Sequence, residues 1–276
     1  LGIAAADLVA LRNDLGRIIV RATITDRVRH GEVFVPMHWT GQYASDGRVD
    51  VLLHANTDPI SGQPELKSSP VAIERFEPAW FAFAVTENKP ELTAFGYAAT
   101  SPCSGSGWRS ELAGTIEPNS WDDLAQTLLF ATPDRRVGAS DASASGHQLL
   151  AYHDATTAQH RFAAFADGAC IGLLFVAREP VAVSRTWAIS QFGAELADSD
   201  RLRLLAGRPG AGVPDRGAIV CACFEVGQND ISSAITKQGA TTVAAVGACT
   251  QAGTNCGSCR AEIGRLIHAL TLAKAG

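Results

Sequence analysis

The C-terminal fold is decided by two cysteine motifs, Cys221-Ala-Cys223 and Cys256-Gly-Ser-Cys259, which 32 residues separate in this 276-residue sequence. A [2Fe-2S] cluster is held by four cysteine thiolates, two for each iron. In an extended chain, Cys-x-Cys places both sulfurs on one side, because side chains alternate with a period of two. We therefore predict that Cys221, Cys223, Cys256 and Cys259 are the metal ligands of one cluster and serve electron transfer.

The second motif has the features of a helix start. Asn255 precedes it and Gly257 lies inside it. The first turn of a helix offers free N–H groups and a dipole that favours negative charge, and both suit thiolate ligands. The terminal unit of about 60 residues has little core of its own, so we expect the cluster to supply much of its folding free energy.

A structural zinc site is the main alternative for these four cysteines. Zinc also accepts four thiolates, although zinc ribbons usually combine two Cys-x-x-Cys motifs and a Cys-x-Cys half is unusual for them. The remaining cysteines, Cys103, Cys170 and Cys249, have no partner of the same kind, and we predict that each is a small buried apolar residue. The clustering fits a reducing compartment rather than a disulfide framework.

Composition excludes several classes of protein. With 46% hydrophobic residues the chain has ample material for two or three domains. Its net charge of −5 does not favour binding to nucleic acid or to an anionic membrane. No apolar run approaches the length of a transmembrane helix. The sequence begins at Leu1 in the middle of a pattern, so we expect a piece of a longer polypeptide, and the lack of a signal-peptide pattern is uninformative.

The spacing of apolar residues and turns predicts a multidomain α+β chain. Residues 1–76 are predicted to be a β-rich unit that amounts to half of a small β-barrel, with strands at 17–25, 33–35 and 70–73. Residues 77–210 are predicted to be a small α+β unit, and residues 211–276 a small helical unit that carries the cysteines.

Local signals place further elements in the second and third units. Ser120 is a plausible N-cap for a helix over 121–130, and Asp167-Gly168 a tight turn between strands. Further predicted elements are strands at 148–152, 160–165 and 170–176, a loop or linker at 138–146, a helix between 184 and 196, and helices that begin at 229 or 230, at 241 or 242, and at 255.

Longer stretches resemble known domains. Gly217-Ala-Ile-Val-Cys-Ala-Cys-Phe-Glu-Val-Gly227 and Ala252-Gly-Thr-Asn-Cys-Gly-Ser-Cys259 resemble the bacterioferritin-associated-ferredoxin-like (BFD-like) [2Fe-2S] domain. Arg29-His-Gly-Glu-Val-Phe-Val-Pro-Met-His-Trp39 and Asp58-Pro-Ile-Ser-Gly-Gln-Pro-Glu-Leu-Lys67 resemble the molybdopterin-dinucleotide-binding domain. In this order, the combination is similar to the C-terminal part of the assimilatory nitrate reductase catalytic subunit.

This resemblance implies a cytoplasmic oxidoreductase that holds molybdenum on two molybdopterin guanine dinucleotides and reduces nitrate to nitrite. It also implies that a [4Fe-4S] cluster lies in an N-terminal portion absent from this sequence. The C-terminal [2Fe-2S] cluster would relay electrons from a flavoprotein or ferredoxin. Without the N-terminal portion, this chain alone is expected to be inactive.

The resemblance carries two cofactor-binding positions to this chain. Lys67 matches a family lysine that contacts the pterin, and Asp50 stands where the family has an asparagine with the same role. The aspartate lacks the amide donor. Two other functions stay open at this point: a related molybdopterin oxidoreductase that acts on another substrate, and a non-catalytic iron–sulfur electron-transfer or adaptor protein.

Overall fold

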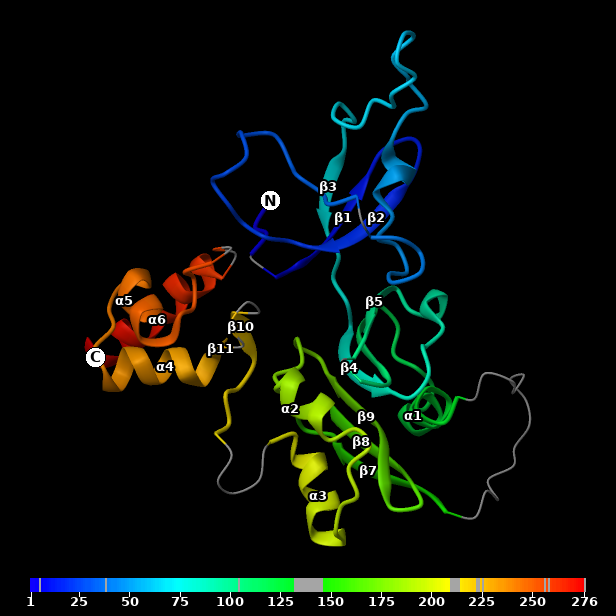
Figure 1. Ribbon diagram of the computed structural model, residues 1–276, viewed down its shortest axis with the longest axis vertical. Helices are drawn as coiled ribbons and strands as arrows, with labels where there is room; N and C mark the ends of the chain where they lie inside the picture. Colours follow the sequence, from blue (N-terminus) through cyan, green and yellow to red (C-terminus); the bar gives the residue numbers. More distant parts are fainter. Residues whose placement is uncertain are drawn as a thin grey trace.

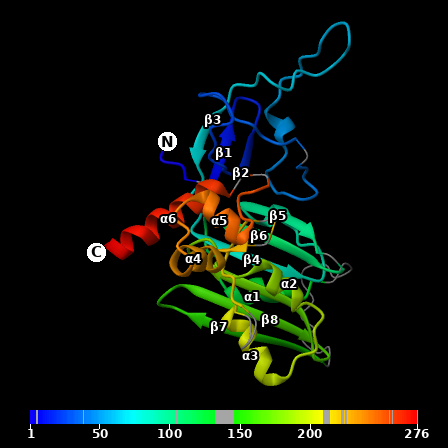
Figure 2. The same cartoon turned by 60° about the vertical axis from the view of Figure 1, so that its left-hand side comes forward.

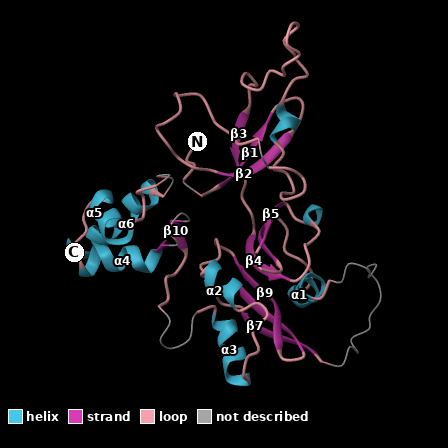
Figure 3. Cartoon of the chain, in the orientation of Figure 1, coloured by secondary structure: helices cyan, strands magenta, loops and turns pink. Residues whose placement is uncertain are grey.

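The computed structural model describes residues 1–4, 6–37, 39–103, 105–131, 146–208, 214–221, 224, 226–255, 257 and 259–275. Within these residues the chain is a mixed α+β structure with three groups of elements (Figures 1 and 3). A small N-terminal sheet lies at the top of Figure 1, a larger central sheet lies below it, and a C-terminal helical unit lies to the left. The α+β class predicted from the sequence is thereby confirmed.

The N-terminal sheet is antiparallel and has three strands, in the order β2 (Arg17–Arg21), β1 (Leu8–Arg12), β3 (Ala72–Arg75). Both faces of β1 are covered. Leu8 and Ala10 lie in one apolar cluster, and Val9 and Leu11 lie in another. Because side chains alternate along a strand, this single strand joins two cores.

The prediction of a strand at 33–35 was wrong. No strand pairs with these residues in the ranges that the structure covers, and Val33 and Phe34 are 48% and 77% exposed. Without a partner their backbone groups are left to solvent, so the β-branched composition is not enough. The strand over 17–25 already ends at Arg21, and the last strand begins at Ala72. A closed barrel is not formed by the described strands, and the half-barrel stays a prediction.

The central sheet has six antiparallel strands. The prediction of strands at 148–152, 160–165 and 170–176, joined by a turn at Asp167, is confirmed, and each strand is slightly longer than predicted. In spatial order the sheet consists of β5 (Tyr97–Pro102), β6 (Trp108–Gly114), β4 (Trp80–Thr86), β9 (Ala169–Ala177), β8 (Gln159–Ala166) and β7 (His147–Asp154).

Helices cover both faces of the central sheet. α1 (Trp121–Leu129) packs on the face that includes Ala82 and Phe162, whereas α2 (Arg185–Ser190) and α3 (Asp198–Ala206) pack on the opposite face. The helix predicted between 184 and 196 corresponds to α2, which is only six residues long. The predicted loop at 138–146 lies outside the described residues, except for its last position.

The N-terminal sheet packs directly on the edge of the central sheet. Tyr97 and Ala113 share an apolar cluster with Leu8 and Ile19. The backbone N–H of Ser45 donates to the carbonyl of Ala98 at 2.9 Å, which extends the edge strand β5 by another segment. The N-terminal sheet and the central sheet are therefore joined by an apolar cluster and by backbone hydrogen bonding.

The C-terminal helical unit contains a two-stranded ribbon and three helices. The N-cap of α4 (Gln228–Lys237) is Gly227, two to three residues before the predicted cap at Asn229 or Asp230. The N-cap of α5 (Val243–Thr250) is Thr242, as predicted. The ribbon consists of β10 (Ile219–Cys221) and β11 (Val226–Gly227), and the last helix is α6 (Arg260–Ala275). None of the helices in the described ranges has the length and apolar character that crossing a bilayer requires.

The N-cap of α1 provides a test of this local structure. The Ser120 hydroxyl accepts a hydrogen bond from the Asp123 N–H at 3.1 Å, as the sequence predicts. Ser120→Ala is expected to lower the opening free energy of α1 by about 1 kcal/mol, because the cap bond is lost. Amide hydrogen exchange within residues 121–129 measures this. Ser190→Ala, at the exposed end of α2, is the control, and equal protection of α1 in both variants would contradict the prediction.

Candidate metal centre and cofactor-binding segment

The β10–β11 ribbon positions Cys221. Cys221 is the last residue of β10, pairs with Val226 of β11 next to a bulge and is only 2% exposed. A methyl group on Gly227 would lie 1.8 Å from the carbonyl oxygen of Arg216, so only glycine lets the ribbon and the start of α4 approach so closely. The Gly227 N–H donates to Asp230 at 3.1 Å, which ties the ribbon to α4.

The second motif ends at the start of α6. Cys259 directly precedes the helix, and its carbonyl accepts the Ile263 N–H at 3.0 Å. The helix therefore begins at Arg260 and not at Asn255, and that prediction was wrong. Gly257 has a φ of +77°, a left-handed conformation that cannot belong to an α-helix. Gly257 consequently lies before the helix and not in its first turn.

The sulfurs of Cys221 and Cys259 lie together in the core of the helical unit. Both residues are buried, in one apolar cluster with Ile231 and Ile263. Burial raises the pKa of the Cys259 thiol to about 11, and a hydrogen bond with Cys221 and the charge of Cys221 add to this increase. N–H groups of Gly253 and Cys259 point at the same sulfur and lower its pKa.

These sulfurs fit a bound metal or cluster. Metal ligation requires thiolates, and the backbone N–H groups beside Cys259 would stabilise one. Burial of the Cys259 thiol in this apolar cluster disfavours its charged form. Metal binding would therefore release protons.

The other two predicted ligands, Cys223 and Cys256, lie outside the described residues. Within the part of the chain that the structure describes, no group of three or more His, Cys, Asp or Glu side chains could hold a metal ion. The set of four ligands therefore stays a prediction, supported by the two cysteines that the fold brings together. The donor chemistry of two thiols does not separate iron from zinc.

The three remaining cysteines differ in burial. Cys170 is fully buried in the central sheet, as predicted, and its pKa is raised to about 11 by burial. Cys103 is partly exposed, and Cys249 is exposed. The prediction was wrong for Cys249, because only Val246 and Gly247 of the short helix α5 are buried.

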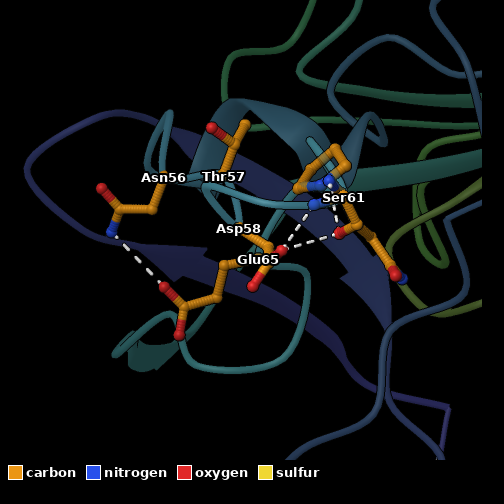
Figure 4. A pocket seen from close by; sticks show the side chains of 7 residues that line it. Asn56, Thr57, Asp58, Ser61 and Glu65 are labelled. Carbon is orange, nitrogen blue, oxygen red and sulfur yellow. Dashed lines mark hydrogen bonds between the residues drawn. The ribbon is translucent and has the colours of Figure 1, made fainter.

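The segment around Asp58 forms a closed loop with an open hollow of about 520 Å³ (Figure 4). The Asp58 carboxylate accepts hydrogen bonds from the N–H groups of Ile60 and Ser61 and from the Ser61 hydroxyl. These bonds hold the pKa of Asp58 below its usual value, and the bonds from Ser61 have the largest effect. The residues that line the hollow are Asn56, Thr57, Asp58, Ser61, Gln63, Pro64 and Glu65.

Both residues predicted to contact the pterin are exposed. Lys67 follows Glu65, the last residue that lines the hollow, by two positions, and it is the cationic residue of the stretch 58–67. Asp50 lies in η1 (Val49–Leu52), and its carboxylate lies 3.1 Å from Nε of Arg48. Asp50 therefore has a cationic neighbour in place of the amide donor that it lacks. The hollow itself carries the Asp58 and Glu65 carboxylates, so Lys67 is the group that suits the anionic part of a dinucleotide.

Sequence reasoning missed two arginines beside the second cysteine motif. A methyl group built on Gly257 would lie 2.9 Å from Nη2 of Arg27 and 3.3 Å from Cδ of Arg260. Arg260 is adjacent to Cys259 in sequence, so its position was a usable signal. Arg27 belongs to the segment after β2, and nothing in the sequence connects it with the distant cysteines.

Comparison with known proteins agrees with both ends of this structure. Residues 1–70 match the family "Molydopterin dinucleotide binding domain", and residues 219–269 match the "BFD-like [2Fe-2S] binding domain". The chain is 34% identical to "Nitrate reductase" of Klebsiella oxytoca over 95% of this chain and 28% of that protein. The resemblance to nitrate reductases through these two domains is therefore confirmed.

Two further relatives match shorter stretches. "Nitrite reductase (NADH) large subunit" of Escherichia coli (strain K12) is 45% identical over 26% of this chain and 8% of that protein. "Nitrogen fixation protein NifU" of Leptolyngbya boryana is 39% identical over 20% of this chain and 27% of that protein. The chain thus spans less than a third of each of these relatives. No solved structure matches the chain significantly.

A glycine pair tests the geometry of the cysteine loop. Gly257→Ala is expected to reduce the amount of cluster that the chain retains after reconstitution, because an alanine at φ +77° costs about 1–2 kcal/mol. Gly264→Ala, in α6 with nothing within 4 Å, is the matched control and should retain the wild-type amount. Visible absorbance and iron content measure this, and equal retention by the two variants would contradict the assigned loop conformation.

Proposed function

We propose that this chain is the C-terminal part of a molybdenum-dependent assimilatory nitrate reductase and relays electrons towards its pterin centre. The observation that carries the proposal is the combination on one chain of a pterin-dinucleotide domain with a BFD-like [2Fe-2S] domain, in which Cys221 and Cys259 meet in a buried site. The similarity to a nitrate reductase over 95% of the chain supports the same substrate.

In this proposal the cysteine loops supply the electron relay. Cys221 and Cys259, with Cys223 and Cys256, would hold the [2Fe-2S] cluster, which when bound supplies one-electron transfer. The apolar core around the two buried sulfurs excludes water from them. The N–H groups at Gly253 and Cys259 would stabilise thiolate charge.

The N-terminal segment supplies part of the pterin site in the same proposal. Lys67 would bind the anionic groups of the molybdopterin guanine dinucleotide, and the polar hollow beside it would accept neutral parts of the cofactor. Molybdenum on two such cofactors, when bound, supplies the chemistry that removes one oxygen from nitrate. Asp50 is proposed to stay near the cofactor through its contact with Arg48.

The remaining features of the proposal rest on the family resemblance. We assign residues 1–76 to a partial molybdopterin-binding β-barrel, 77–210 to an α+β docking domain and 211–276 to the [2Fe-2S] domain. The complete enzyme would be cytoplasmic, carry a [4Fe-4S] cluster in its N-terminal portion and accept electrons from a flavoprotein or ferredoxin. Alone, the 276-residue chain should not reduce nitrate.

A second candidate is a related oxidoreductase that acts on another oxyanion. The observation in its favour is the 45% identity to the large subunit of a nitrite reductase over a quarter of this chain. This candidate keeps the same cluster and the same relay, and it differs only in the substrate.

Reoxidation of the cluster tests the proposed substrate and relay together. The complete polypeptide is reduced anaerobically, freed of excess reductant and mixed with nitrate. The [2Fe-2S] electron paramagnetic resonance (EPR) signal is expected to disappear as nitrite forms. Cys259→Ser is expected to lack the signal and to form less nitrite, because a buried ligand is lost.

Two outcomes would contradict the proposal. A reduced signal that persists with nitrate but disappears with nitrite would favour the second candidate. Nitrite formation that is equally fast in wild type and in Cys259→Ser, when electrons enter through the cluster domain, would exclude the relay role.

A further inference from the structure

The N-terminal segment and the helical unit meet at the second cysteine motif. A methyl group built on Gly257 would lie 2.9 Å from Nη2 and 3.8 Å from Cζ of Arg27, so the guanidinium lies against the backbone at this glycine. Arg27 follows β2 of the N-terminal sheet, whereas Gly257 lies between Cys256 and Cys259. Figures 1 and 2 both show the start of α6 beside the N-terminal segment.

The geometry at Gly257 makes this approach possible. Gly257 has a φ of +77° and no side chain, and its carbonyl accepts the Arg260 N–H at 3.1 Å. The loop thus presents bare backbone to the incoming guanidinium. Any larger residue at this position would displace Arg27 from the loop.

Two cationic side chains consequently flank the loop. Arg260 belongs to the helical unit and packs against Gly257 and Gly253. Arg27 belongs to the pterin-binding segment and lies against Gly257. A [2Fe-2S] cluster with four thiolates is anionic and gains one more negative charge on reduction. A nearby positive charge therefore favours the reduced form, as it favours any anion.

We propose that Arg27 is a positioning residue for the electron relay: it docks the backbone at Gly257 onto the pterin-binding segment and makes the bound cluster easier to reduce. The inference rests on the proposed function, because it requires the cluster in this loop. Arg27 joins the two cofactor-binding segments of the chain directly. The same contact would fix the distance between them, on which the rate of electron transfer depends.

A set of charge variants tests this in the reconstituted 276-residue chain. Arg27→Gln removes the charge, and Arg27→Lys keeps it. Arg29→Gln is the matched control, because Arg29 lies in the same segment, is exposed and lies near Glu32, with Nε 3.7 Å from Oε1. The measurements are the midpoint potential of the [2Fe-2S] cluster by EPR titration and amide hydrogen exchange of residues 254–260.

Arg27→Gln is expected to lower the equilibrium constant for cluster reduction by about three- to tenfold, where tenfold corresponds to about 59 mV for one electron. The shift should become smaller at high ionic strength, because the Arg27 side chain is accessible to salt. Exchange of residues 254–260 should become faster. Arg29→Gln should leave both quantities within about twofold of wild type, because the Arg29 side chain is 88% exposed and its charge is screened by solvent. Arg27→Lys should keep the potential.

The outcomes separate this inference from the proposed function. Equal potentials and equal exchange in Arg27→Gln and Arg29→Gln, with a normal cluster in both, would overturn the role of Arg27 and leave the proposed function intact. A change in only one of the two quantities, or an equal shift in Arg27→Lys and Arg27→Gln, would also overturn it. A wild-type chain that binds no iron and sulfide would overturn both.

Discussion

The burial of two cysteine sulfurs side by side is the interaction on which the C-terminal unit depends. Cys221 arrives on a ribbon and Cys259 at the start of a helix, and each is part of the same apolar core. Burial and the neighbouring Cys221 raise the pKa of Cys259 to about 11, which favours the protonated thiol near neutral pH. A bound metal or cluster would hold the thiolate form instead and would thereby stabilise the small core around it.

The N-terminal sheet is the part of the molecule that has contacts on both sides. The central sheet is buried on both faces, and the N-terminal sheet packs on its edge through Tyr97 and Ala113. The cysteine loop meets the N-terminal segment at Arg27. A relay between two cofactors needs a fixed distance between them, and the direct contact at Arg27 would help to set that distance in the proposed enzyme.

Elements with strong local signals could be predicted from the sequence, and elements fixed by distant contacts could not. Ser120 and Thr242 cap helices as their side chains indicate, because capping involves only the next few residues. β4 was missed because both of its faces are buried and no alternation is visible. The start of α6 was misplaced because the left-handed Gly257 prevents a helix there. Arg27 had no sequence signal, since its contact is made only by the fold.

The metal content of the anaerobically purified chain tests the central claim most directly. Iron, acid-labile sulfide and zinc are measured together with the EPR spectrum after dithionite reduction. We expect about two iron and two sulfide per chain, as one [2Fe-2S] cluster requires, with a signal that is lost in Cys256→Ser. About one zinc per chain, with no iron after reconstitution, would make the C-terminal unit a structural module and would exclude electron transfer through it.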